Sequence, residues 1–300
     1  MSAEATAGTV TAGTAFERAT AVTAEADGRF TAIVDGGWSA PAGPNGGYLA
    51  AIVVRALEGR MAAEGDWRLR SLTCHYLRSA QDGPMELRVE VIRAGRRTAS
   101  ARLSAVQDGR ERLAALAAFT APGLDAAPEW GPLPPDVAPA PTRDAPTVPA
   151  AAYRRRAGHW LEPLPELPPI VHRVRVAPQI GGAAFAGRLP ESGAAAETAG
   201  WVALAEPQRL DAAALALFTD IWWPPSFEVL DAPAIVPTVE LTIHVRCDLP
   251  PAGLEFGPVL GHYRSPASVG GLVDEDASVF LADGTLAVQA RQISLLSRIR

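Results

Sequence analysis

The sequence predicts an α+β protein made of two similar halves, each with one helix and several antiparallel strands. Three observations support this fold class. Apolar residues recur at helical spacing within each half, and segments of alternating polar and apolar residues follow them. Each half ends in two such segments joined by an Asp-Gly pair, which is a strong signal for a β-hairpin. A proline-rich stretch separates the halves, with thirteen of the 27 prolines between Pro122 and Pro169.

In the first half, the segment "NGGYLAAIVVRALEGRM" (residues 45–61) predicts a helix. Its apolar stripe comprises Tyr48, Leu49, Ile52, Val53, Ala56 and Leu57. Four alternating segments follow, and we expect strands at 72–77, 85–93, 97–107 and 112–119. The Asp108-Gly109 pair joins the last two of these strands into a hairpin.

The second half repeats this order of signals. A strand-like segment at 170–176 precedes a helical segment at 210–223, and further strands are expected at 238–246, 267–281 and 285–296. Asp283-Gly284 joins the last two, and the tetrapeptides LTCH (72–75) and LTIH (241–244) lie at corresponding places in the two halves. The shared order indicates an internal duplication.

One helix with four or five antiparallel strands predicts a curved sheet wrapped around a central helix, which is the hotdog architecture. We therefore expect a double hotdog, with an N-terminal hotdog domain at 1–125, a Pro-rich linker at 126–168 and a C-terminal hotdog domain at 169–300. Residues 151–160 of the linker are expected to form one short helix. The two copies should pack side by side, with a ligand cleft at their seam.

The composition excludes several classes of protein. A formal net charge of −6 argues against a nucleic-acid partner, because phosphates require a basic surface. No run of about 18 apolar residues occurs, so no membrane span is expected. The first fourteen residues do not read as a secretory signal, and Cys74 and Cys247 match no metal or redox spacing. We expect a cytoplasmic protein, and a homo-oligomer stays open because exposed sheet edges and helix faces of such folds often pair.

Several stretches of the sequence are similar to one known family. In the first half they are "NGGYLAAIVVRA" (45–56), "LTCHYLRSA" (72–80) and the hairpin at 95–119. In the second half they are "ALALFTDIWWPP" (214–225), "PTVELTIHVR" (237–246) and "DGTLAVQARQISL" (283–295). The sequence resembles the acyl-CoA thioesterase II family, whose members are double hotdog enzymes, along nearly the whole chain.

The resemblance implies an acyl-CoA thioesterase that converts an acyl-CoA and water to a free acid and CoA, without a metal, another cofactor or a covalent intermediate. It implies that the family's catalytic Asp, Thr and Gln are Asp220, Thr238 and Gln292 in this sequence. The chain departs from the family in a shorter loop between Asp220 and Thr238. It also has Trp222 and Trp223 where the family has smaller polar residues, which bears on substrate preference more than on fold.

The chemistry of Asp220 fits a general base. Hydrolysis of a thioester adds water to the carbonyl carbon, which requires a group that takes a proton and a donor for the developing oxyanion. An ordinary aspartate is a weak base, but burial among Phe218, Trp222 and Trp223 is expected to raise its pKa. The alternative is a carboxylate bonded to nearby backbone at a helix end, although a negative charge near a helix C-terminus is unfavourable by about 0.3–1 kcal/mol.

Strand alternation gives different expectations for the other two side chains. Gln292 falls on the same face as Leu286, Val288 and Ala290, so its amide ends an apolar face and needs hydrogen-bond partners. The alternative is a strand-end glutamine turned to solvent. Alternation places Thr238 on the polar face, unless a β-bulge or a position at the seam brings it to the site. A structural threonine at the start of a strand is the alternative.

The start of the first helix is the expected substrate-binding region. The unpaired N–H groups at Asn45-Gly46-Gly47 are suited to a thioester carbonyl or a phosphate. Asn45 is alternatively a plain N-cap. The expected acyl-pocket rings, for which core packing is the alternative, are those of Trp38, Tyr48 and Trp222.

Two other functions stay open at this point. One is an enoyl-thioester hydratase or dehydratase, whose sites use an Asp and His pair, although no His follows Asp220 closely. The other is a non-catalytic module that binds acyl-CoA or a lipid. The acyl chain length, and whether CoA or a carrier protein presents the acyl group, depend on pocket features that the sequence does not determine.

Overall fold

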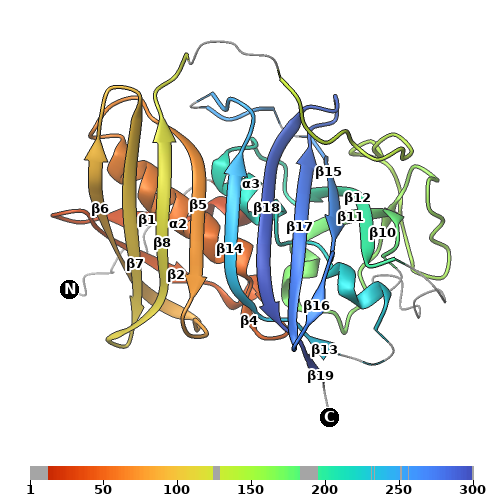
Figure 1. Ribbon diagram of the computed structural model, residues 1–300. Helices are drawn as coiled ribbons and strands as arrows, with labels where there is room; N and C mark the ends of the chain where they lie inside the picture. Colours follow the sequence, from red (N-terminus) through yellow and green to blue (C-terminus); the bar gives the residue numbers. More distant parts are fainter. Residues whose placement is uncertain are drawn as a thin grey trace, which may run out of the picture.

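The computed structural model describes residues 13–123, 129–182, 195–230, 232, 234–250, 252–255 and 257–298. Fifteen strands form one continuous sheet, and two helices, α2 (Gly46–Met61) and α3 (Ala212–Phe218), lie behind it (Figure 1). Strands of the first half occupy one side of this sheet and strands of the second half occupy the other. This is the arrangement expected of two hotdog units side by side.

The first half places a long helix against six strands of the large sheet. Its sheet runs in the order β1 (Val22–Ala24), β2 (Arg29–Val34), β6 (Gly83–Ala94), β7 (Thr98–Gln107), β8 (Arg110–Thr120) and β5 (Arg68–Tyr76). A short helix α1 (Ala15–Thr20), a 3₁₀ turn η1 (Gly36–Trp38) and the two-residue strands β3 (Ser39–Ala40) and β4 (Gly43–Pro44) complete it. Neighbouring strands of this half pair antiparallel, as expected.

The second half repeats the order around a shorter helix. Its sheet continues as β14 (Thr238–Val245), β18 (Leu286–Leu295), β17 (Leu272–Phe280), β15 (Val259–Arg264), β12 (Glu197–Leu204) and β11 (Val174–Ile180). The remaining elements are the 3₁₀ turns η2 (Pro169–Arg173) and η4 (Pro225–Glu228) and the short strands β13 (Ala234–Ile235), β16 (Ser268–Val269) and β19 (Ser297–Arg298).

The seam between the halves is the antiparallel pair β5–β14. Thr73 lies opposite Thr242, and their hydroxyl oxygens are 2.9 Å apart. These residues are the second positions of LTCH and LTIH, so equivalent residues of the two halves meet at the centre of the seam. The internal duplication therefore appears in space as an approximate two-fold axis through this threonine pair.

The two helices form the centre of the core and pack against each other with opposite chain directions. Every residue of α3 is buried, and eleven residues of α2 are buried. Such helices are apolar on nearly all sides because the sheet and the other helix cover them. Asp211 caps the start of α3, and its side chain pairs with Arg55 of α2 at 2.7 Å. No helix within the described ranges is long and apolar enough to span a membrane.

The proline-rich segment packs against the outer face of the second half's sheet. It contributes the short strands β9 (Thr147–Val148) and β10 (Trp160–Leu161) at the edge of the large sheet. A separate apolar cluster forms there around Trp160 and Trp201, with Val137, Ala140 and Ala145 against it. The helix expected at 151–160 is wrong, because the chain there makes turns and then enters β10. The domain boundaries themselves stay a prediction.

Candidate active site

Asp220 lies where the end of α3 meets the start of α2. The helix ends at Phe218, and a turn places Asp220 beside the first residues of the other helix. A Cβ atom added to Gly47 would lie 2.9 Å from the carbonyl oxygen of Leu217 and 3.0 Å from the Cβ of Asp220. Only glycine therefore permits this close approach, which brings a carboxylate of the second half to a helix N-terminus of the first.

Three hydrogen bonds from the protein reach the Asp220 carboxylate. Its Oδ2 accepts the backbone N–H of Gly47 at 2.9 Å and the side-chain amide of Asn45 at 3.0 Å. Its Oδ1 accepts the amide of Gln292 at 3.1 Å. Although Asp220 follows the C-terminus of its own helix, where a negative charge is unfavourable, it faces the N-terminus of α2, where the helix dipole stabilises that charge.

The surroundings make Asp220 a stronger base than an ordinary aspartate. Burial raises its pKa to about 6, in the predicted direction. Hydrogen bonds from Gly47, Gln292 and Asn45 lower the pKa and so limit the rise. The residue keeps partial solvent exposure, which is compatible with access of water. A carboxylate with this pKa is mostly ionised at neutral pH, yet takes up a proton more readily than an exposed aspartate does.

Gln292 connects Asp220 to Thr238. It is 4% exposed and lies on the inner face of β18, as strand alternation predicted. Its nitrogen donates to Asp220, and its oxygen accepts the Thr238 hydroxyl at 2.8 Å. Strands β14 and β18, together with the turn after α3, thus assemble one hydrogen-bonded series of three side chains.

A β-bulge turns Thr238 toward this series. Thr238 lies opposite the buried Ser294, whereas Glu240 lies opposite Ile293, so Val239 is an extra residue on β14. The extra residue reverses the alternation, and Thr238 shares the inner face with Gln292. The bulge was one of the two arrangements that we expected could reconcile Thr238 with the site.

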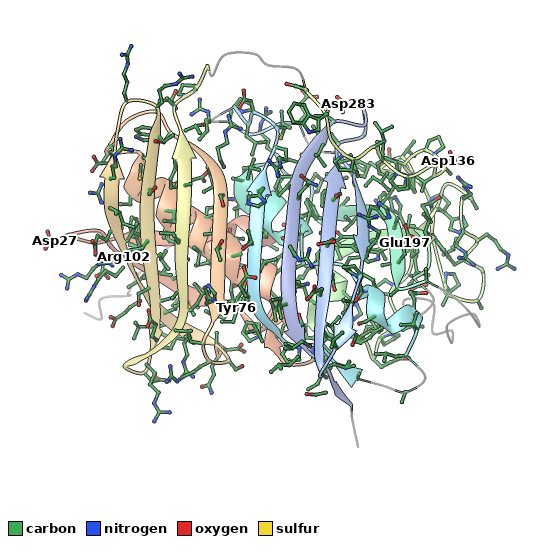
Figure 2. All side chains as sticks on the ribbon, in the orientation of Figure 1. Asp27, Tyr76, Arg102, Asp136, Glu197 and Asp283 are labelled. Atoms are coloured by element: carbon green, nitrogen blue, oxygen red, sulfur yellow. The ribbon has the colours of Figure 1, made fainter. Side chains whose placement is uncertain are left out.

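Two tyrosines, the partly buried Tyr76 and the buried Tyr263, fix the backbone at the helix ends that form the site. Tyr76, labelled in Figure 2 at the end of β5, donates its hydroxyl to the Gly46 carbonyl oxygen at 2.7 Å. Tyr263 donates to the Phe218 carbonyl oxygen at 2.6 Å. Burial raises the pKa of both hydroxyls well above the ordinary range, and the charge of Asp220 raises it further. Both tyrosines therefore remain hydrogen-bond donors at any physiological pH.

The expected substrate-binding residues occupy two kinds of position. Asn45 is the N-cap of α2, since its side-chain oxygen accepts the Tyr48 N–H at 2.9 Å, and its amide nitrogen also holds Asp220. The Gly47 N–H is engaged by Asp220, and the Gly46 carbonyl is engaged by Tyr76. In this structure the start of α2 therefore binds the carboxylate of Asp220.

The three rings expected at the acyl pocket are packed in the core. Tyr48 and Trp38 are stacked with ring centroids 5.6 Å apart, and they are 0% and 1% exposed. Trp222 stacks on Tyr263 and donates its ring N–H to Thr198 at 2.9 Å. These contacts correspond to the core packing that was the alternative. A contact of any of these rings with substrate stays a prediction.

The sequence interpretation missed one buried carboxyl group near these residues. Glu275 lies on β17 directly opposite Gln292 of β18 and is 5% exposed. Its place between Val273 and Ala277 on one face of an alternating segment was a usable signal, because a charged residue then interrupts an apolar face. Within the described ranges, no cluster of His, Cys, Asp or Glu side chains has the make-up of a metal site.

Family comparison identifies the two halves separately. The model of the acyl-CoA thioesterase N-terminal domain matches residues 34–120, and that of the acyl-CoA thioesterase C-terminal domain matches residues 134–296. The chain belongs to the acyl-CoA thioesterase family. This membership agrees with the resemblance found in the sequence, and it supports thioesterase activity in general. No curated protein matches the chain.

Solved structures of similar proteins confirm the double hotdog fold. A hot dog fold protein of unknown function from Alicyclobacillus acidocaldarius is 24% identical, with a TM-score of 0.81 over 96% of this chain and 100% of that one. A candidate thioesterase II from Thermobifida fusca is 26% identical, with a TM-score of 0.77 over 95% and 98%. An acyl-CoA thioesterase II from Mycobacterium marinum is 18% identical, with a TM-score of 0.65 over 95% and 99%.

Proposed function

We propose that the protein hydrolyses acyl-CoA thioesters with water activated by Asp220. The observation that carries this proposal is the hydrogen-bonded series Thr238–Gln292–Asp220, in which a carboxylate with a raised pKa is held by three partners from both halves. Family membership supports the thioester as the bond that is broken.

In the proposed reaction, Asp220 removes a proton from water while the water oxygen forms a bond to the thioester carbonyl carbon. The tetrahedral intermediate then collapses, the C–S bond breaks, and the departing sulfur receives the proton to give CoA and a free acid. Gln292 and Thr238 orient the water, because they are polar groups on the same inner face. Side-chain groups of this kind raise the rate by positioning and by proton transfer.

Release of free thiol from acyl-CoAs of several chain lengths tests the proposal. We expect Asp220→Ala to lower kcat by roughly 10²–10⁴-fold, the usual contribution of a general base. The wild-type rate should fall as the pH drops below about 6, because protonation removes the basic form of Asp220. If the wild-type protein releases no more thiol than Asp220→Ala on every acyl-CoA, the catalytic proposal fails.

Two further measurements separate this function from the other candidates. Loss of enoyl absorbance without thiol release would identify a hydratase or dehydratase. Binding of an acyl-CoA in calorimetry, without turnover of any substrate, would identify a binding module.

A further inference from the structure

Glu275 is a buried carboxyl group that the proposed reaction does not use. Its neighbours Asp274 and Asp276 pair with Arg291 at 2.6 and 3.7 Å. Glu275 is on the opposite, buried face of β17 and forms no ion pair with any described residue. An uncompensated buried carboxylate is costly, so a neutral carboxylic acid is the stable form at this position.

The first half of the chain shows which residues the hotdog fold needs at the positions equivalent to Gln292 and Glu275. Leu241 of β14 lies opposite Gln292, and Leu72, its counterpart in LTCH, lies opposite Ala117 of β8. Across the hairpins, Gln292 then pairs with Glu275, whereas Ala117 pairs with Ala101.

Both alanines are buried in a well-formed sheet. The hotdog unit therefore folds with small apolar residues at these two positions. The half that contains Asp220 has a glutamate and a glutamine there instead, so the polar pair belongs to the site and not to the fold.

The charge state of Glu275 follows from its neighbours. Burial raises the pKa of this carboxyl well above its usual range, and the negative charge of Asp220 raises it further. A polar contact from the Gln292 amide lowers the pKa but does not reverse the shift. Asp220 accepts hydrogen bonds from two additional donors, Asn45 and Gly47, which Glu275 does not have. Of the two carboxyl groups, Asp220 is thus the one that ionises first.

We propose that Glu275 is a positioning residue, which holds the Gln292 amide in place as a neutral carboxylic acid. One N–H of this amide donates to Asp220, and Glu275 faces the amide from the paired strand. The amide oxygen is thereby kept on the Thr238 hydroxyl, so the amide is fixed in the one orientation that links Thr238 to Asp220. This inference rests on the proposed function, because it assigns Glu275 to the same site.

The same arrangement predicts a loss of activity at high pH. The titratable groups that face Glu275 are Asp220 from the turn after α3 and Tyr263 from β15, and the charge of Asp276 acts on it from the other face of its own strand. Tyr263 keeps its proton, so Glu275 is the next of these groups to ionise after Asp220 as the pH rises. Its ionisation would place a second negative charge beside Asp220 and withdraw the neutral partner of Gln292.

Two substitutions at this position test the inference in the full-length protein. Glu275→Gln keeps the size and removes the ionisable proton, so kcat at pH 7 should stay within about threefold of wild type while the loss of activity at high pH disappears. Glu275→Ala releases the Gln292 amide, and kcat should fall by roughly 10–100-fold with little change in KM. Glu228→Gln removes the carboxyl group of another buried glutamate, which accepts the Gly182 N–H at 2.8 Å, and should leave both kcat and the pH profile unchanged.

The inference fails if Glu275→Gln loses as much activity as Glu275→Ala, or if it keeps the wild-type loss at high pH. Infrared spectroscopy provides a readout that needs no substrate. The difference spectrum between the wild-type protein and Glu275→Gln at pH 7 should show the carbonyl band of one protonated carboxyl group, because the contribution of Glu58, whose pKa is about 7, is common to both proteins. If the band is present but the wild-type protein hydrolyses no thioester, the proposed function fails and the neutral state of Glu275 stands. If the band is absent, the positioning role as a neutral acid is wrong.

Discussion

The substitution Asp220→Asn should remove activity, and the stability of the variant relative to wild type should increase as the pH rises from 4 to 7.5. Burial raises the pKa of Asp220 from 3.8 to about 6. A shift of this size is equivalent to about 3 kcal/mol at about 1.4 kcal/mol per pKa unit. Because the residue is partly exposed, solvent screening reduces this figure, and we expect about 1–2 kcal/mol.

The sign of the effect follows from proton linkage. The folded protein holds the proton of Asp220 more tightly than the unfolded chain does, so the contribution of Asp220 to stability is fully present below about pH 4. It is lost as the pH rises toward 6, and it does not return above that value. In Asp220→Asn no such loss occurs, because asparagine does not ionise.

Urea unfolding of both proteins between pH 4 and pH 7.5 measures the difference. The free energy of unfolding of Asp220→Asn relative to wild type should increase by about 1–2 kcal/mol across this range and then level off. The amide group of Asn also changes the hydrogen bonds at this position, but this effect alters the free energy of unfolding of the variant by the same amount at every pH. The contribution of Glu275 is common to both proteins while Glu275 keeps its proton. A difference that is independent of pH, or that decreases as the pH rises, would refute the assignment of a raised pKa to Asp220.

Three other substitutions test the construction of the site and the seam. Gly47→Ala places a methyl group 2.9 Å from the Leu217 carbonyl oxygen, so urea unfolding should show a loss of stability of about 1–3 kcal/mol, and kcat should be lower. The control is Gly59→Ala on the same helix, whose methyl group meets only Phe30 and should leave kcat unchanged. Thr238→Val keeps the shape of the side chain and removes the hydroxyl bonded to Gln292, so kcat should fall roughly 10-fold or more. Thr238→Ser keeps the hydroxyl and should retain activity. Equal rates for the two variants would exclude a role for the hydroxyl. Arg55→Met removes the partly exposed ion pair with Asp211, so thermal unfolding should show a loss of stability of about 1 kcal/mol, and kcat should not change. A change in kcat would mean that this end of the helix pair also contributes to the site.

The fold was predictable from the sequence because its signals are local and occur twice. Helical spacing identified α2, Asp-Gly pairs identified both final hairpins, and alternation identified β5 to β8, β14 and β18. The strands β2, β12 and β15 were not predicted, and the single strand expected at 267–281 is divided into β16 and β17. The helix expected at 210–223 is shorter in the structure and ends at Phe218, since the chain must turn to bring Asp220 to the other helix. The packing of the proline-rich segment on the outer sheet was missed, because such contacts depend on distant residues such as Trp201.

The candidate site was predictable only in part. The inner position of Gln292 follows from alternation, whereas that of Thr238 depends on a bulge that composition does not indicate. The first half was expected to contribute mainly through contacts with substrate. In the structure Asn45 and Gly47 instead hold Asp220, and this arrangement depends on how two helices from different halves pack.

The division of the site between the halves explains why one copy of the duplicated unit is insufficient. A carboxylate that must be both buried and ionised needs donors, and the N-terminus of the first helix supplies them. At the opposite end of the helix pair, the approximate two-fold axis brings the start of α3 beside α2, where Asp211 caps α3 and pairs with Arg55. Glu58 lies near this pair, and burial followed by the charge of Asp211 raises its pKa to about 7. At this end of the helix pair the partner of the carboxylate is therefore a cation, Arg55. Of the two ends, only the one with Asp220 offers a carboxylate held by neutral donors, and such a carboxylate can accept a proton from water.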